Sequence, residues 1–219
     1  MHSVRIVKSS RKSISLQVTP SGEVIARAPK FMPDILIKAF VKKQERWIEA
    51  HLKKVSLYPK RISHTYSTGD EFWYLGERIS LTIGPYKKIE VRSGKLYFPE
   101  ILLFRIKREL TDFYIKKARD IITNEVEDFT HKMHTTYKDI SFSDTKSQWG
   151  RCTHDNRLQF SWKLVMSPLL TIRYVVIHEL AHTLEKNHSR AFWSKVRQFI
   201  PSYRQQIKWL KENGRSLTV

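Results

Sequence analysis

The stretch from Tyr174 to His188 constrains this chain more than any other part of its sequence. It contains the pattern His-Glu-x-x-His, followed after five further residues by a third histidine. Four apolar residues surround the polar ones, and they are Val175, Val176, Ile177 and Leu180. A segment with this pattern is predicted to be a buried helix that carries a polar site. The remaining sequence is interpreted as scaffold, substrate groove and charged surface around that site.

The three histidines of this stretch have the spacing of metal ligands. His178 and His182 are four residues apart, so on a helix they lie on one face and can bind the same ion. His188 follows beyond the expected end of the helix and can turn back as a third ligand. Three protein ligands leave a fourth position open for water, which is typical of a catalytic zinc site. The pattern therefore predicts one Zn²⁺, although imidazole also binds other divalent metals.

Glu179 is the candidate catalytic residue. On a helix it is rotated by about 100° from His178, which places its carboxylate beside the ion. There it can take a proton from zinc-bound water and activate that water for attack on a peptide bond. The alternative is that His178 and His182 are core histidines with satisfied hydrogen bonds. Glu185 is open to two interpretations, as a carboxylate that holds a ligand imidazole or as a solvated residue at the helix end.

Composition places the chain among globular proteins, with 41% hydrophobic and 28% charged residues over 219 residues. No run reaches the roughly 18 uncharged apolar residues that a membrane helix needs. The first residues lack the apolar core of a signal peptide. The single cysteine, Cys152, excludes an intramolecular disulfide and fits a reducing compartment. We therefore expect a cytoplasmic location and no membrane partner.

The net charge of +19 is concentrated toward the two ends of the chain. Counted from the sequence, residues 1–62 carry +10 and residues 141–219 carry +8. Such a field attracts phosphate backbones or acidic proteins, so contact with DNA or nucleoprotein through the basic ends is one interpretation. The other is that the charge only keeps the protein soluble.

The N-terminal region, residues 1–98, is predicted to be a small antiparallel β-sheet with one helix. Residues 4–28 alternate in polarity around a turn at 19–22, which indicates a hairpin. A basic amphipathic helix is expected from Pro33 to Val55, with its lysines either on nucleic acid or in solvent. Tyr58–Arg61 is interpreted as a turn or linker. Further strands are expected at 71–75, 78–83, 89–91 and 95–98.

The C-terminal region, residues 99–219, is predicted to be mainly helical, and the two regions are expected to form one compact unit. Ser167 is expected to cap the site helix, Pro168–Leu184, and Ser189 to cap the helix after it. The remaining expected elements are helices at 99–133, 190–199 and 201–214 and strands at 140–143 and 157–164, the latter two separated by a polar segment.

Several short motifs resemble one known family along nearly the whole chain. They are Ser147-Gln148-Trp149-Gly150-Arg151-Cys152, Leu158–Leu164, His178–His182, Asn187-His188-Ser189, Phe192-Trp193, Ser10–Leu16, Trp47-Ile48 and Tyr74-Leu75-Gly76. This set is similar to the YgjP-like metallopeptidase domain, which is related to the SprT-like and WLM zinc proteases. The resemblance implies an α+β fold with a zincin-like catalytic core and a short sheet. It also implies His178, His182 and His188 as zinc ligands and Glu179 as general base.

Two positions depart from the family pattern and concern substrate preference. Arg151 stands where the family usually has serine, and Ser161 stands where it usually has asparagine before a tryptophan. The related SprT-like and WLM proteases act on DNA–protein crosslinks, so proteins bound to nucleic acid are a candidate substrate class by analogy.

The strand from Arg157 to Trp162 is expected to form the upper rim of the cleft. A peptide could pair with its exposed edge through main-chain hydrogen bonds. The candidate substrate-binding residues are Arg151, Arg157, Gln159 and Ser161. Trp149 and Trp193 are interpreted as core residues, and no partner indicates that Cys152 is a nucleophile.

Two hypotheses for function follow from the sequence. The first is a zinc metallopeptidase that acts on protein or peptide substrates. The alternative is a basic, nucleic-acid-associated binding protein whose metal site is structural or vestigial.

Overall fold

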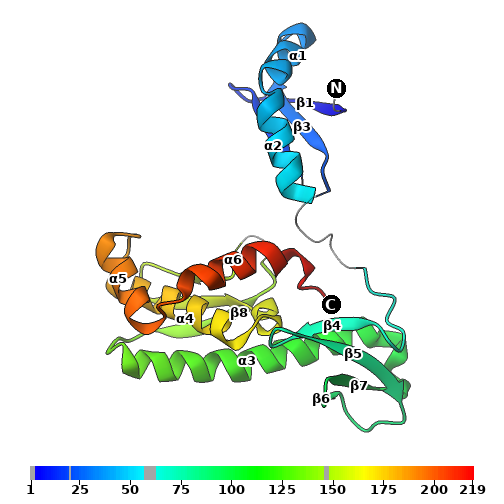
Figure 1. Cartoon of the computed structure of the whole chain (residues 1–219), viewed down its shortest axis with the longest axis vertical. Helices are drawn as coiled ribbons and strands as arrows, with labels where there is room; N and C mark the ends of the chain where they lie inside the picture. The colour runs from blue at the N-terminus through cyan, green and yellow to red at the C-terminus, as the bar shows by residue number, and fades with distance from the viewer. Residues whose placement is uncertain (1–2, 20, 57–62, 146–147) are drawn as a thin grey trace. The chain divides into compact units, whose positions relative to one another are not determined.

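The computed structural model describes residues 3–19, 21–56, 63–145 and 148–219. The chain divides into two compact units, Met1–Lys60 and Arg61–Val219, hereafter unit 1 and unit 2 (Figure 1). Helices and small mixed sheets occupy separate stretches, which confirms the predicted α+β class. The linker expected at Tyr58–Arg61 lies outside the described residues. No helix in the described part of the chain is long and apolar enough to cross a membrane.

Unit 1 is a three-stranded sheet with two helices. Its strands are β1 (Val4–Ser9), β2 (Ser15–Val18) and β3 (Val24–Pro29), in the order β1-β3-β2. The predicted hairpin is present, because β2 and β3 are antiparallel. β1 instead lies parallel to β3, so the sheet is mixed rather than antiparallel. β3, the more buried strand, takes the central position, with β2 on one side and β1 on the other.

The prediction of a single helix from Pro33 to Val55 is wrong in one respect. The structure has two helices, α1 (Asp34–Lys43) and α2 (Glu45–Ser56), which are separated at Gln44. α1 contacts β3 whereas α2 contacts β2, so the chain has to bend between them. Ile37 of α1 packs with Ala26 and Ala28 in a small core of its own.

Unit 2 begins with a four-stranded sheet in the order β4-β5-β7-β6. The strands are β4 (Glu71–Tyr74), β5 (Glu77–Gly84), β6 (Glu90–Arg92) and β7 (Lys95–Pro99). The outer pairs are antiparallel and the central pair, β5 and β7, is parallel. A 3₁₀ turn, η1 (Glu100–Arg105), then leads into the long helix α3 (Ile106–Lys132).

The boundary predicted between residues 98 and 99 does not coincide with the division between Lys60 and Arg61. The apolar side chains of the four-stranded sheet pack in the same core as those of α3 and the helices that follow it. Phe72 and Phe98 of the sheet and Tyr114 of α3, all fully buried, belong to one cluster. A boundary after residue 98 would cut through this shared core.

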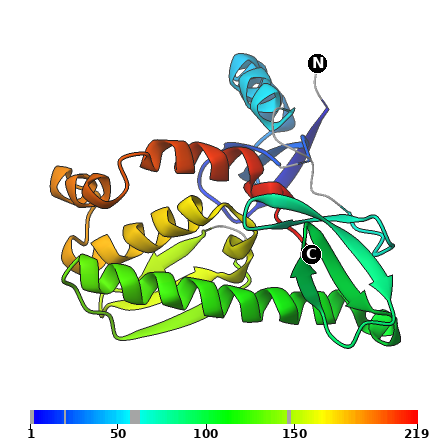
Figure 2. The same cartoon turned by 60° about the horizontal axis from the view of Figure 1, so that its bottom comes forward.

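Of the remaining helices of unit 2, the first packs against α3 and the other two pack against that first one. They are α4 (Leu169–Leu184), α5 (Arg190–Phe199) and α6 (Tyr203–Asn213), followed by the short turn η3 (Gly214–Ser216). α4 lies beside α3 on one side and contacts α6 on another, so it is the central helix of the unit (Figures 1 and 2). This position explains why its sequence is apolar on nearly all sides.

A second sheet of unit 2 has the order β8-β10-β9. β8 (Asp139–Ser143) is parallel to β10 (Arg157–Ser161), and β9 (Gly150–Cys152) is antiparallel to it. β9 falls in the polar segment that is predicted to separate the strands at 140–143 and 157–164. After Ser161 the chain turns into η2 (Trp162–Met166), so the strand predicted as far as Leu164 ends earlier.

Candidate metal centre and catalytic site

The start of α4 is held by backbone contacts rather than by the predicted serine cap. The Ser167 hydroxyl is buried and donates to the carbonyl of Leu164 at 2.7 Å, and no side-chain hydrogen bond caps the first turn of α4. Pro168 takes the N-cap position without a side-chain bond. The preceding turn η2 is tied to the β4–β5 turn, because the Leu75 amide donates to Val165 and the Gly76 amide donates to Met166. The sheet therefore positions the helix that carries the site.

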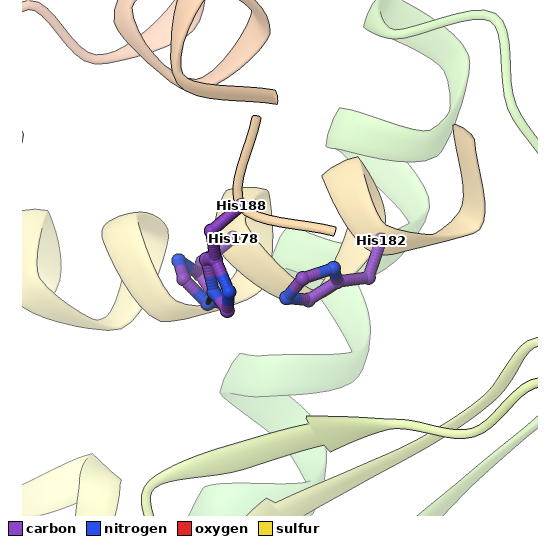
Figure 3. A group of neighbouring side chains, drawn as sticks. All are labelled: His178, His182 and His188. Carbon is purple, nitrogen blue, oxygen red and sulfur yellow. Dashed lines mark hydrogen bonds between the residues drawn. The ribbon is translucent and has the colours of Figure 1, made fainter. Parts of the chain in front are cut away.

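Three imidazoles converge at the end of α4. His178 and His182 project from successive turns, and His188 reaches them from the loop after the helix (Figure 3). One ligand atom from each residue lies within 4.8 Å of the other two. The Nε2 atoms of His178 and His188 are 3.1 Å apart. A tetrahedral zinc ion with Zn–N bonds of about 2.0–2.1 Å places its ligand nitrogens roughly 3.3 Å apart, which is close to the separation of His178 and His188, and three imidazoles are a donor set that zinc accepts.

The ring of His182 is oriented by the backbone at the helix end. Its Nδ1 lies 3.1 Å from the carbonyl oxygen of Glu185. A proton on Nδ1 donated to that oxygen leaves Nε2 with its lone pair free to bind a cation. Glu185 thus orients the His182 ring through its main-chain carbonyl. This hydrogen bond does not involve the Glu185 carboxylate, for which the sequence suggested two roles.

Burial keeps the helical histidines neutral. It lowers the pKa of His178 to about 3, and the neighbouring His182 and His188 add to the effect. Burial also lowers the pKa of His182, against the hydrogen bond to Glu185, which raises it. A metal competes with protons for imidazole, so neutral rings at physiological pH favour binding of a cation.

Glu179 lies between α4 and the strand β9. Its side chain is only 5% exposed, and burial raises its pKa to about 8 while the backbone amide of Cys152 acts in the opposite direction. Gly150 lies directly against it, since a Cβ atom at position 150 would come within 2.6 Å of Glu179 Cγ and Oε1. Any larger residue there would displace the carboxylate. This role of Gly150 is not predicted from the sequence, because the spacing of the motif holds no signal for it.

The loop that carries His188 is anchored on both sides. Ser189 caps α5 as predicted, because its hydroxyl accepts from the Phe192 amide at 3.2 Å. On the other side Lys186 donates to the Asn156 side chain in the β9–β10 turn. The ring of Trp193 stacks on His188, with centroids 5.7 Å apart. The third candidate ligand is therefore exposed but held by its neighbours.

The predicted rim strand occupies a different place from the one expected. β10 is the central strand of its sheet and has no free edge, because β8 and β9 pair with its two sides. Among the described residues β9 is the edge strand on the side of α4. The expectation that a peptide pairs with the edge of Arg157–Trp162 is therefore wrong. A strand this buried is favoured at the centre of a sheet.

The four candidate substrate residues do not gather at Glu179. The Arg157 guanidinium pairs with Asp155 at 2.9 Å and with Asp139 at 2.7 Å. A Cβ atom at Gly150 would point at Glu179, and alternate residues of a strand point to opposite faces, so Arg151 points away with its partner Gln159. Ser161 is 1% exposed. Their roles in binding substrate stay predictions.

Cys152 contributes to the site through its backbone amide, which donates a hydrogen bond to Glu179. Its thiol is half-buried, and burial raises its pKa, which disfavours the thiolate that a nucleophile requires.

A carboxylate buried beside three converging imidazoles on a His-Glu-x-x-His helix defines the class of metallopeptidase centres. The family model of the YgjP-like metallopeptidase domain matches residues 12–213, so the chain belongs to that family. Among solved structures, the metallopeptidase zymogen of Pyrococcus abyssi abylysin is similar to this chain with 17% identity and a TM-score of 0.39, over 43% of this chain and 97% of that one. A search of the curated proteins finds no match.

Proposed function

We propose that this metallopeptidase domain binds one zinc ion through His178, His182 and His188 and hydrolyses peptide bonds with Glu179 as general base. The observation that carries the proposal is the position of Glu179, buried next to the converging imidazoles. When bound, the ion would polarise the substrate carbonyl and lower the pKa of a water molecule. Glu179 would accept a proton from the attacking water and pass it to the leaving amine.

Substitution of Glu179 tests this role. The Glu179→Gln variant should keep its zinc, because the amide is not one of the proposed ligands, and should lose about 10²- to 10⁴-fold in peptide cleavage. Zinc content is measured by elemental analysis of the purified protein, and cleavage of unfolded proteins by mass spectrometry. The matched control is Glu127→Gln on the exposed face of α3, which should cleave like wild type. Wild-type cleavage by Glu179→Gln would show that Glu179 is not the base, whereas a zinc-loaded wild type that cleaves nothing would favour the alternative of a binding protein with a structural metal.

The substrate backbone is proposed to pair with β9 rather than with β10. β9 is the edge strand of its sheet in the described part of the chain and lies against Glu179. An extended peptide that adds to this edge would run past the metal centre with its main chain held by hydrogen bonds.

Contact with nucleic acid is the second part of the proposal, and charge supports it. Unit 1 carries a net charge of +9 by sequence count. Lys38, Lys42, Lys43 and Arg46 are exposed on its helices α1 and α2. A field of this sign attracts phosphate, so DNA affinity should fall steeply between about 50 and 200 mM salt. Affinity for duplex DNA that is absent, or unchanged over this range, would rule out a phosphate-driven contact.

A further inference from the structure

A pocket opens beside Glu179 between α4 and α6. Its volume is about 350 Å³, within the range of pockets that bind ligands. His178 and Glu179 form one part of its wall. A group that enters the pocket is therefore adjacent to the proposed ligand and the proposed base.

The rest of the wall is largely apolar. Val175 lies on α4 one turn before Glu179, and Ile207 and Leu210 face it from α6. Trp149, just before the edge strand β9, and Tyr174 of α4 add two aromatic rings to this wall. Because these residues come from three separate segments, only the packing of α6 against α4 creates the pocket.

The tryptophan wall is held in place by the end of α6. A Cβ atom at Gly214 would come within 2.6 Å of Trp149 Cζ2, so the indole lies directly on the backbone there. Leu210 is 8% exposed and belongs to the main core, whereas Ile207 is only partly buried. Ile207 is thus the wall residue whose size can be changed with least effect on the fold.

Lys211 adds a positive charge to the wall. Its side chain is exposed, so the ammonium group stays in contact with water at the pocket. A basic side chain that entered the pocket would meet this like charge. An apolar side chain would bury its surface against Trp149, Ile207 and Leu210 without such a penalty.

We propose that this pocket receives the substrate side chain next to the cleaved bond and selects large apolar residues over basic ones. The inference rests on the proposed peptidase function and deepens it, because it assigns a side-chain preference to the same site. Ile207 sets the size of the accepted side chain, and Lys211 excludes lysine and arginine.

The test is cleavage of a proteome-derived peptide library, with the residues on both sides of each cleaved bond identified by mass spectrometry. On one side of the bond, the zinc-loaded wild type should favour Leu, Met, Phe and Tyr, and Lys and Arg should be depleted. Ile207→Phe fills the pocket and should shift the preference toward Ala, Ser and Val by about tenfold. Ile207→Ala should shift it toward the largest side chains.

Charge reversal tests the second half of the inference. Lys211→Glu should admit Lys and Arg at the selected position. Lys208→Glu is the matched control, because Lys208 is an exposed lysine on the same helix that does not line the pocket. Its cleavage profile should equal that of the wild type. A wild-type profile without preference, or one that Ile207→Phe leaves unchanged, would overturn the inference.

A binding measurement separates failure of the inference from failure of the proposed function. If the zinc-loaded wild type cleaves no peptide, the peptidase proposal fails, and the pocket is tested by fluorescence polarisation. The probes are fluorescein-labelled alanine-rich peptides with one Leu or one Lys, bound to the full-length Glu179→Gln protein. The Leu peptide should bind about tenfold more tightly. Equal affinity of the two peptides, or a difference that survives Ile207→Phe, would overturn the inference.

Discussion

At the scale of single residues, the geometry of the site depends on the small size of Gly150 as much as on the histidines. The Glu179 carboxylate fills the space that a side chain at position 150 would occupy, and the Cys152 amide donates to it from the same strand. The strand thus limits the carboxylate to one position. A general base acts only within hydrogen-bond reach of the proton it takes, so this restraint bears directly on the proposed chemistry.

We predict that Gly150→Ala keeps its metal and loses activity. The added methyl group moves the Glu179 carboxylate, and a displacement of about 1 Å can lower a rate by roughly 10²-fold. Zinc content and peptide cleavage are measured together. Gly84→Ala on β5 serves as the control, since its added carbon meets only the ring of Tyr86. Wild-type cleavage by Gly150→Ala would show that the strand does not position the base.

The ionisation of Glu179 gives a second prediction, for the metal-free protein. Burial raises its pKa from 4.5 to about 8, so the folded state binds more protons than the unfolded chain between these values. Stability is therefore lost as the pH rises through this range, with a slope of up to about 1.4 kcal/mol per pH unit. Glu179→Gln lacks this ionisation, so its stability relative to wild type should increase from pH 5 to pH 8. Urea unfolding of both proteins checks this, and a constant difference would contradict it.

At the scale of elements, the end of α4 and the start of α5 together place His188. The loop between them is short, and it is fixed by the Ser189 cap on one side and by Lys186 in the β9–β10 turn on the other. A ligand on such a loop can reach the helical pair only if both neighbouring elements hold their ends. The caps of these helices therefore bear on metal affinity as well as on stability.

We predict that Ser189→Ala lowers the free energy of unfolding by about 1 kcal/mol and weakens zinc binding. Ser202→Ala is a matched control, because Ser202 occupies the N-cap position of α6 but its side chain makes no capping bond. Ser202→Ala should change the free energy of unfolding by no more than about 0.5 kcal/mol. Thermal unfolding and competition with a zinc chelator provide the two measurements. Equal effects of the two substitutions would argue against the cap.

At the scale of the whole molecule, the two units have separate hydrophobic cores. Ala26, Ala28 and Ile37 form the buried cluster of unit 1, and the candidate metal centre lies entirely in unit 2 with the larger cluster. The family match nevertheless extends over residues 12–213 and so includes most of unit 1. The proposed metal binding and the proposed contact with nucleic acid thus concern different units and can be tested separately.

We predict that a fragment of residues 63–219 folds, binds zinc and cleaves peptides at rates close to those of the full chain. The reason is that every residue of the proposed site and its core lies within this fragment. Its DNA affinity should fall relative to the full chain, because unit 1 carries about half of the net charge. Circular dichroism, zinc analysis and DNA titration provide the measurements. An unfolded fragment would show that unit 2 depends on unit 1.

The sequence by itself determined the features that depend on local spacing. Helical periodicity predicted α4 and the meeting of His178 with His182, and the Ser189 signal predicted the start of α5 close to its observed position. The resemblance of short motifs predicted the family that the model match confirms. The α+β class also followed, because strands and helices have different periods that can be read within a few residues.

Only the tertiary structure decided which strand lies at the edge of the sheet, and this choice changed the interpretation of the site. β10 lies in the middle of its sheet, where β8 and β9 cover its two edges. β9 is therefore the edge strand that lies against Glu179. Arg157 forms ion pairs with two aspartates, and residues of α6 form part of the wall of the pocket. These contacts join residues that are far apart in the chain. They are set by competition for buried surface across the whole unit, which spacing along a sequence does not encode.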